Sequence, residues 1–161
     1  MSYVESNLMP DERVIYTAKV HWSVFIPGFI FLAFSLLHGL VGGVQNNPAF
    51  FVFFWPAAFF LVRGHLIRTS TELAVTSKRI VAKFGLIRRH TIELNLNKVE
   101  SFHVEQGLSG RMFGYGTINI SGTGGVRTPI KQIDQPLEFR RSAVAAVDAA
   151  QSNGTAQQRA A

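Results

Sequence analysis

The feature that most constrains this chain is a long stretch without charge: no Asp, Glu, Lys or Arg occurs between Lys19 and Arg63. All charged residues lie in the remainder, at a density that is ordinary for a soluble domain. The alternative, a buried core helix broken by a turn, would need more surrounding apolar surface than a 161-residue globule can supply. Two membrane-spanning helices are therefore predicted, because about 20 apolar residues cross a hydrocarbon core of about 30 Å.

The two predicted spans are residues 22–44 and 48–67, and the short link between them indicates an antiparallel hairpin over 22–67. Asn47 is a candidate N-cap, and Pro48 suits the first position of the second helix. Pro56 is expected to kink that helix.

Basic residues flank the hairpin, whereas the link between the spans has none. Arg13 and Lys19 precede the first span, and Arg63 and Arg68 lie at the end of the second. By the positive-inside rule, this pattern predicts a protein of the inner (cytoplasmic) membrane with two spans and both termini in the cytoplasm.

Residues 70–150 have the pattern of a mainly-β domain. Short runs rich in β-branched residues alternate with turn residues, at 72–77, 79–84, 86–96, 99–106, 115–121 and 126–133. A weaker alternating run covers 14–20. A loop is expected at 107–114 and a C-terminal helix from about Pro136, with an apolar stripe that includes Phe139 and Ala143. Six or seven strands of this kind favour an antiparallel sandwich or barrel.

The predicted organisation therefore has four parts. They are a cytoplasmic N-terminal segment (1–21), a transmembrane helical hairpin (22–67), a β domain with a C-terminal helix (70–150) and a disordered tail (151–161).

The whole basic excess of the chain lies directly after the apolar stretch. These candidate lipid-headgroup-binding residues are Arg63, Arg68, Lys78, Arg79, Lys83, Arg88 and Arg89. Basic residues next to a bilayer attract anionic headgroups, by on the order of 1 kcal/mol each. A solvated face is the alternative, and nucleic acid is not expected as a partner because the segment lacks interleaved exposed aromatic residues. The two pairs of adjacent basic residues are expected in turns that face the same surface.

Three small residues repeat every four positions in the first span: Ser35, Gly39 and Gly43. Such a stripe lets helices approach closely, either within the hairpin or between protomers. His38, in the same span, is expected to have an interfacial or helix-packing role.

No pattern in the chain indicates catalytic chemistry. The absence of cysteine excludes disulfides, thiol nucleophiles and cysteine-based zinc sites. The five histidines are isolated, and the segment Gly107–Arg111 lacks the final glycine of a nucleophile elbow. We therefore predict no catalytic residue, no metal site, no cofactor and no enzymatic activity.

Two longer motifs indicate a family. They are Leu73-x-Val-Thr-Ser-Lys-Arg-Ile80 and Gly110-Arg-Met-Phe-Gly-Tyr-Gly-Thr117. With the preceding hairpin, this order of parts resembles bacterial membrane proteins that carry a pleckstrin-homology-like (PH-like) domain of the second bacterial type. The resemblance covers about residues 8–150 and implies an open barrel of about seven strands in two sheets, closed at one end by the C-terminal helix. It brings no catalytic residues.

These observations together predict a non-enzymatic, membrane-anchored PH-like module for binding or scaffolding at the cytoplasmic membrane surface. Its expected partners are anionic membrane lipids, a protein partner or further copies of itself. The alternative is an accessory subunit of a membrane transport or envelope-stress complex, with the transmembrane hairpin as its interface.

Overall fold

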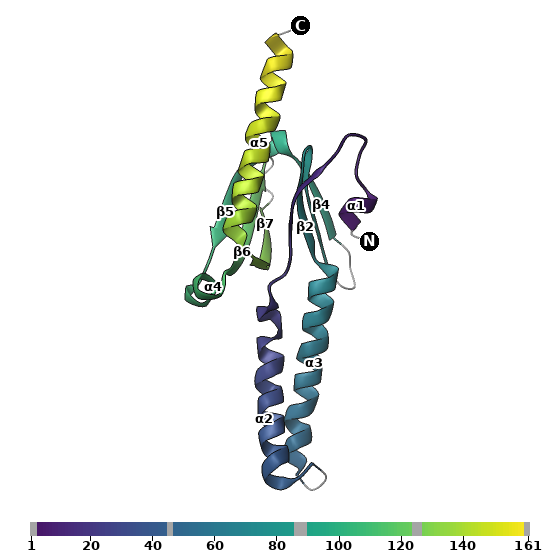
Figure 1. The fold of residues 1–161 in the computed structure, drawn as a ribbon, viewed down its shortest axis with the longest axis vertical. Helices are drawn as coiled ribbons and strands as arrows, with labels where there is room; N and C mark the ends of the chain where they lie inside the picture. Colours follow the sequence, from purple (N-terminus) through teal and green to yellow (C-terminus); the bar gives the residue numbers. More distant parts are fainter. Residues whose placement is uncertain (1–2, 45–46, 86–89, 124–126, 160–161) are drawn as a thin grey trace. The chain divides into compact units, whose positions relative to one another are not determined.

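The computed structural model describes residues 3–44, 47–85, 90–123 and 127–159 (Figure 1). The chain divides into two compact units. The hairpin unit is Trp22–Thr69, and the β unit combines Met1–His21 with Ser70–Ala161.

The hairpin unit consists of a short 3₁₀ turn, η1 (Trp22–Phe25), followed by the helices α2 (Ile26–Gly42) and α3 (Pro48–Ser70). The Asn47 Oδ1 atom accepts the backbone N–H of Ala49 at 3.0 Å, so the N-cap predicted from the sequence is confirmed. α3 continues as one helix through Pro56.

The β unit contains two antiparallel sheets in its described residues. The first sheet has the order β1-β2-β3-β4 and the second the order β5-β6-β7. Their bounds are β1 (Val14–Ala18), β2 (Glu72–Thr76), β3 (Arg79–Phe84), β4 (His90–Asn95), β5 (Val99–Glu105), β6 (Tyr115–Gly122) and β7 (Arg127–Asp134). The mainly-β prediction is confirmed, and no closed barrel forms in this part of the chain.

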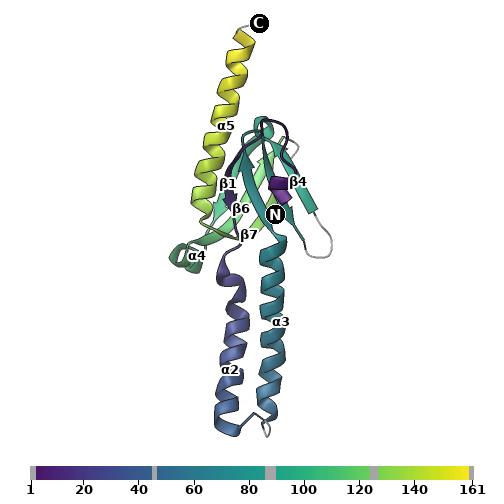
Figure 2. The ribbon, with the colours of Figure 1, turned by 45° about the vertical axis from the view of Figure 1, so that its right-hand side comes forward.

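The remaining elements of the β unit are short except for the last. They are α1 (Tyr3–Ser6), η2 (Leu96–Lys98), α4 (Leu108–Phe113) and α5 (Pro136–Arg159). Figure 2, a second view of the ribbon, shows the long helix α5 beside the sheets and α4 close to where α5 begins.

Three expectations from the sequence need correction. Residues 1–21 are not a separate segment, because β1 pairs with β2 in the first sheet. The expected loop at 107–114 contains the helix α4, which ends at Gly114 in the left-handed conformation (φ 78°) that glycine favours as a helix terminus. The expected tail 151–161 is helical as far as Arg159, although its run 152–155 consists of poor helix formers.

The core of the β unit lies where α5 packs against the sheets. Its buried stripe, with Phe139, Ala143 and Ala146, contacts strands of both sheets, including β1, β2, β5 and β6. The opposite face of the first sheet is covered by the N-terminal segment, where Val4 packs on Ala74 and Val81. Both faces of β2 are therefore buried, as its run of buried residues shows.

Candidate functional site

Large apolar side chains cover the outside of the hairpin unit. Trp22–Gly42 and Pro48–Ser70 are each long and apolar enough to cross a membrane. Yet only 17% of the most apolar part of the first helix and 11% of that of the second are buried within the protein. Leu40 is 84% exposed and Trp55 is 69% exposed. Water-soluble monomers rarely expose apolar patches beyond a few hundred Å². The helices therefore lack the burial that the core helices of a soluble domain have.

Two of the three predicted helix-packing residues lie between the helices of the hairpin. The buried Ser35 hydroxyl donates to the Phe50 carbonyl oxygen at 3.0 Å. A Cβ atom added at Gly39 would lie 3.0 Å from the Phe50 ring. Gly43 differs, since a Cβ there would meet nothing within 4 Å and its φ is 72°. The stripe thus serves packing within the hairpin, with Gly43 ending α2.

Three further small residues, missed in the sequence analysis, pack the same interface as Ser35. Gly28 and Ser35 on α2, and Ala57 and Gly64 on α3, are buried. A Cβ at Gly28 would approach Leu61 to 2.7 Å, and one at Gly64 would approach Phe25 to 2.8 Å. Their seven-residue spacing is the signal that could have revealed them, because heptad repeats place residues along one helix–helix seam.

His38 contributes to the end of the hairpin. Its Nδ1 atom lies 3.0 Å from the carbonyl oxygen of Phe34, so this nitrogen is the donor. The carbonyl oxygen of His38 itself accepts from the Asn47 amide at 2.9 Å. The His38 ring also lies against Phe53 of α3, with the ring centroids 5.2 Å apart, which agrees with the helix-packing role expected for it.

The basic residues that the structure describes after the hairpin do not form one cluster. Glu72 at the start of β2 pairs with Lys83 near the end of β3, whereas the turn at 77–78 joins the other ends of these strands. β3 has six residues, which corresponds to about 20 Å at about 3.3 Å per residue. Lys78 and Lys83 therefore lie near opposite ends of β3, and the prediction that the two basic turns face the same surface also involves Arg88 and Arg89. Arg88 and Arg89 themselves lie outside the described residues.

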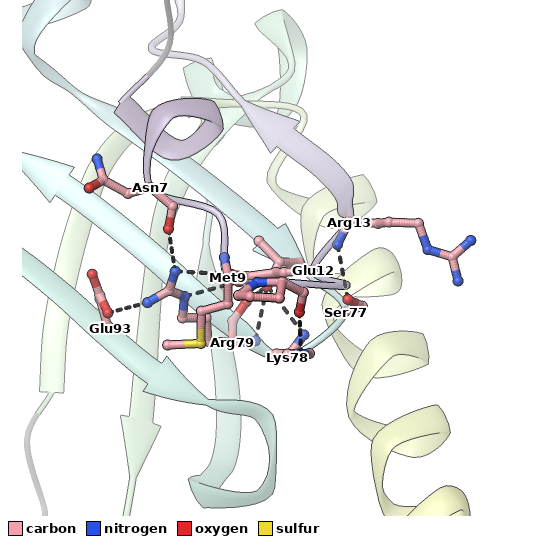
Figure 3. Close-up of polar contacts among 10 residues, drawn as sticks. Asn7, Met9, Glu12, Arg13, Ser77, Lys78, Arg79 and Glu93 are labelled. Carbon is pink, nitrogen blue, oxygen red and sulfur yellow. Dashed lines mark hydrogen bonds and ion pairs between the residues drawn. The ribbon is translucent and has the colours of Figure 1, made fainter.

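Arg79 must be removed from the headgroup-binding set, because its guanidinium is buried in an ion-pair network (Figure 3). Its Nε and Nη2 atoms donate to the two carboxylate oxygens of Glu12, at 2.9 Å and 3.0 Å. Nη1 donates to Glu93 at 2.6 Å, and Nη2 also reaches the Asn7 carbonyl oxygen at 2.7 Å. The sequence analysis missed this role because the partners are distant in the chain.

The Glu12 carboxylate accepts further hydrogen bonds besides those from Arg79. The Met9 backbone N–H donates to it at 2.7 Å, and the Thr76 hydroxyl lies 2.7 Å from its other carboxylate oxygen. Burial alone would raise the pKa of the Glu12 carboxyl, but hydrogen bonds from Arg79, Met9 and Thr76 outweigh it, so the pKa lies below its ordinary value. The network ties the N-terminal segment to β2 and β3.

The other basic residues have different surroundings. Arg63 and Arg68 are exposed on α3. Lys83 lies 3.9 Å from Glu72, next to the point where the chain returns from the hairpin. Lys78 is exposed at the distant turn, where its ammonium donates to the Pro10 carbonyl oxygen at 2.7 Å.

We define the exit end of the β unit as the part around His21, where the chain leaves for the hairpin. The His21 N–H donates to the Gln132 carbonyl oxygen at 2.7 Å, and the Asp134 N–H donates to Lys19 at 2.9 Å. The His21 ring stacks on Tyr115 with the ring centroids 5.1 Å apart. These contacts hold the last residues before the hairpin against β6 and β7.

The short helix α4 is braced at this exit end. The Gln106 amide donates to the Tyr115 carbonyl oxygen at 3.0 Å, and the Ser109 and Tyr115 hydroxyls are 2.8 Å apart. The Gln135 N–H donates to the Gly114 carbonyl oxygen at 2.9 Å. A Cβ at Gly110 would lie only 2.5 Å from the Tyr115 carbonyl oxygen, so a larger residue does not fit there.

An open hollow of about 500 Å³ lies beside α4, lined by residues that include Tyr16, Arg111 and Glu138. Burial raises the pKa of Tyr16, and the carboxylates of Glu138 and Asp134 raise it further. The phenol therefore stays protonated at neutral pH. Among the described residues, no group of three or more His, Asp or Glu side chains could hold a metal ion.

Comparison with known proteins gives one match. Residues 24–147, more than half of the chain, match the family model described as a bacterial PH domain. No curated protein matches the chain. No solved structure matches it either.

Proposed function

The chain belongs to the bacterial PH domain family, and on this basis we propose that it is a membrane-anchored PH-like module for binding or scaffolding at the cytoplasmic surface of the inner membrane. The observation that carries the proposal is the exposed apolar surface of α2 and α3. Contact of such a surface with lipid acyl chains is favourable, whereas its contact with water is unfavourable.

The proposal assigns headgroup contact to the basic residues that the chain keeps near the hairpin. Arg63 and Arg68 are exposed on α3, and Lys83 lies beside the start of β2, directly after α3. Each contributes on the order of 1 kcal/mol where it approaches an anionic surface. Arg88 and Arg89 join this set from their place in the sequence, between β3 and β4.

The small-residue packing gives little support to the alternative of an accessory subunit that uses the hairpin as its interface. Ser35 and Gly39 are occupied by contacts with Phe50 inside the hairpin. They are therefore not open to a second protein, and the lipid-anchored module accounts for the exposed apolar side chains without one.

The test has two parts and uses the full chain. Membranes from expressing cells are washed with alkaline carbonate, and we expect the protein to stay in the pellet. The protein is then purified in mild detergent, and mass spectrometry measures the anionic lipid that co-purifies. Arg63→Gln, Arg68→Gln and Lys83→Gln together should lower that amount.

The matched control removes the same number of positive charges, all of them in the β unit. Arg13→Gln, Lys78→Gln and Lys98→Gln remove three basic side chains that are exposed at the 77–78 turn or near it. They should leave the lipid content unchanged. Extraction of the protein by carbonate would refute anchoring, and equal lipid loss in both triple variants would refute headgroup binding by the first set.

A further inference from the structure

The helix α4 exposes three large apolar side chains. Leu108 is 88% exposed, Met112 is 77% exposed and Phe113 is about half exposed. The hydrogen bonds around Gln106, Ser109 and Gly114 hold the helix in place. A braced segment that presents its apolar residues outward needs a reason beyond folding, because exposed apolar groups are normally scattered singly.

The position of α4 is limited by covalent and ring contacts, whatever orientation the two units adopt. α4 ends at Phe113, two residues before Tyr115, and two residues span at most about 7 Å. The Tyr115 ring stacks on His21, whose next residue, Trp22, begins the first apolar helical segment. α4 is therefore held close to the point at which the chain enters that segment.

We propose that Leu108, Met112 and Phe113 of α4 insert into the interfacial region of the bilayer that holds the hairpin. This inference rests on the proposed function, since it needs α2 and α3 to be in a membrane. It adds a second, shallow attachment point to the β unit. The basic cluster predicted from the sequence does not include these residues.

The chemistry of α4 favours a lipid surface over a protein partner. A stable protein interface buries about 1,200–2,000 Å², far more than three side chains supply. Apolar side chains that enter the interface reach about 5–10 Å into it, which suits a helix of six residues. Arg111 is exposed on the same helix, and residues 107–114 include no acidic side chain to oppose anionic headgroups.

The experiment uses single cysteines in the full chain, which has none of its own. Met112→Cys probes α4, and Leu36→Cys, exposed on α2, is the positive control for a lipid environment. Asn97→Cys, in η2, is the negative control. The Leu96 N–H of η2 donates to the carbonyl oxygen of Lys78, so η2 lies at the end of the first sheet that is far from the start of β2. Each variant carries an environment-sensitive fluorophore in phosphatidylcholine–phosphatidylglycerol vesicles, with quenchers at shallow lipid positions, deep in the acyl chains, or in the water.

We expect the labels at positions 36 and 112 to shift to shorter wavelength and to be quenched from the lipid. The label at position 97 should be quenched only by aqueous iodide. Adding Leu108→Asp to the Met112→Cys variant should return that label to the water, and Leu108 is so exposed that the change should not unfold the unit.

Three results would overturn the inference in distinguishable ways. If position 36 is quenched from the lipid while position 112 behaves like position 97, insertion of α4 is refuted and the proposed function stands. If position 36 is not quenched from the lipid, membrane anchoring fails and the inference fails with it. If position 112 is shielded from both quenchers, and the more so at higher protein-to-lipid ratio, α4 contacts another protein molecule instead.

Discussion

Replacement of Arg79 by methionine should destabilise the β unit strongly, because it leaves the buried Glu12 carboxylate without its counter-ion. The two side chains are 7% and 0% exposed. Methionine removes the two hydrogen bonds to Glu12 as well as those to Glu93 and Asn7. Removing one partner of a buried pair costs about 3–5 kcal/mol, and we expect a loss of that size here.

The loss can be measured by amide hydrogen exchange of β2 and β3, followed by mass spectrometry on the full chain in detergent. A change of 3–5 kcal/mol corresponds to exchange faster by about a hundred-fold to several thousand-fold, at about 1.4 kcal/mol per factor of ten. Lys83→Met is the matched control on the same strand. Its partner Glu72 is 3.9 Å away, and this pair is longer and less buried than that of Arg79 with Glu12, so its loss should cost less.

The effect should depend on pH in a defined direction. In the unmodified protein the pKa of Glu12 is lowered, so its stabilisation is present at neutral pH and is lost only as the pH falls through the folded-state value. Without Arg79, burial instead raises the pKa of Glu12, and protonation relieves the buried charge. The difference between variant and parent should therefore narrow from pH 7 to about pH 4.5.

A double variant separates the ion pair from general damage. Glu12→Met with Arg79→Met should recover part of the protection, because apolar side chains often replace a buried pair without loss. The account of the network would be refuted if amide exchange in Arg79→Met were less than ten-fold faster than in the unmodified protein. Exchange no faster than in Lys83→Met would refute it as well.

Three further predictions concern topology, hairpin packing and α4. In intact cells an impermeant thiol reagent should label Asn46→Cys and not Thr155→Cys, since both termini are expected inside the cell; the reverse result would refute the orientation. Gly28→Leu should lower the melting temperature of the hairpin, followed by the fluorescence of Trp22 and Trp55, because its Cβ would lie 2.7 Å from Leu61, whereas Val41→Leu on the exposed surface should not. Gly110→Ala should destabilise the β unit by about 1–3 kcal/mol in urea unfolding followed by circular dichroism, since its Cβ would approach the Tyr115 carbonyl oxygen to 2.5 Å. Gly107→Ala, whose Cβ meets nothing within 4 Å, is the control, and equal effects of the two changes would contradict the steric argument.

The local patterns of the sequence were sufficient to predict the two long apolar helices, the strands and the beginning of α5. Uncharged length indicated α2 and α3, alternation indicated the strands, and the apolar spacing around Phe139 indicated the packed face of α5. The Asn47 cap could be predicted for the same reason, since its contact spans only two residues. In each case the controlling interaction lies within a few residues along the chain, where periodicity and capping preferences act.

The pairing of distant segments was decided only by the tertiary structure. Charge density alone suggested one basic cluster, yet strand register places Lys78 and Lys83 near opposite ends of β3, and Glu12 withdraws Arg79 from the surface across 67 positions of sequence. The exposure of Leu108 and Met112 was likewise hidden, because a short apolar run has the same composition whether it is buried or exposed. The physical reason is that burial and ion pairing depend on which surfaces meet after folding, whereas helix and strand patterns depend on neighbours in the chain.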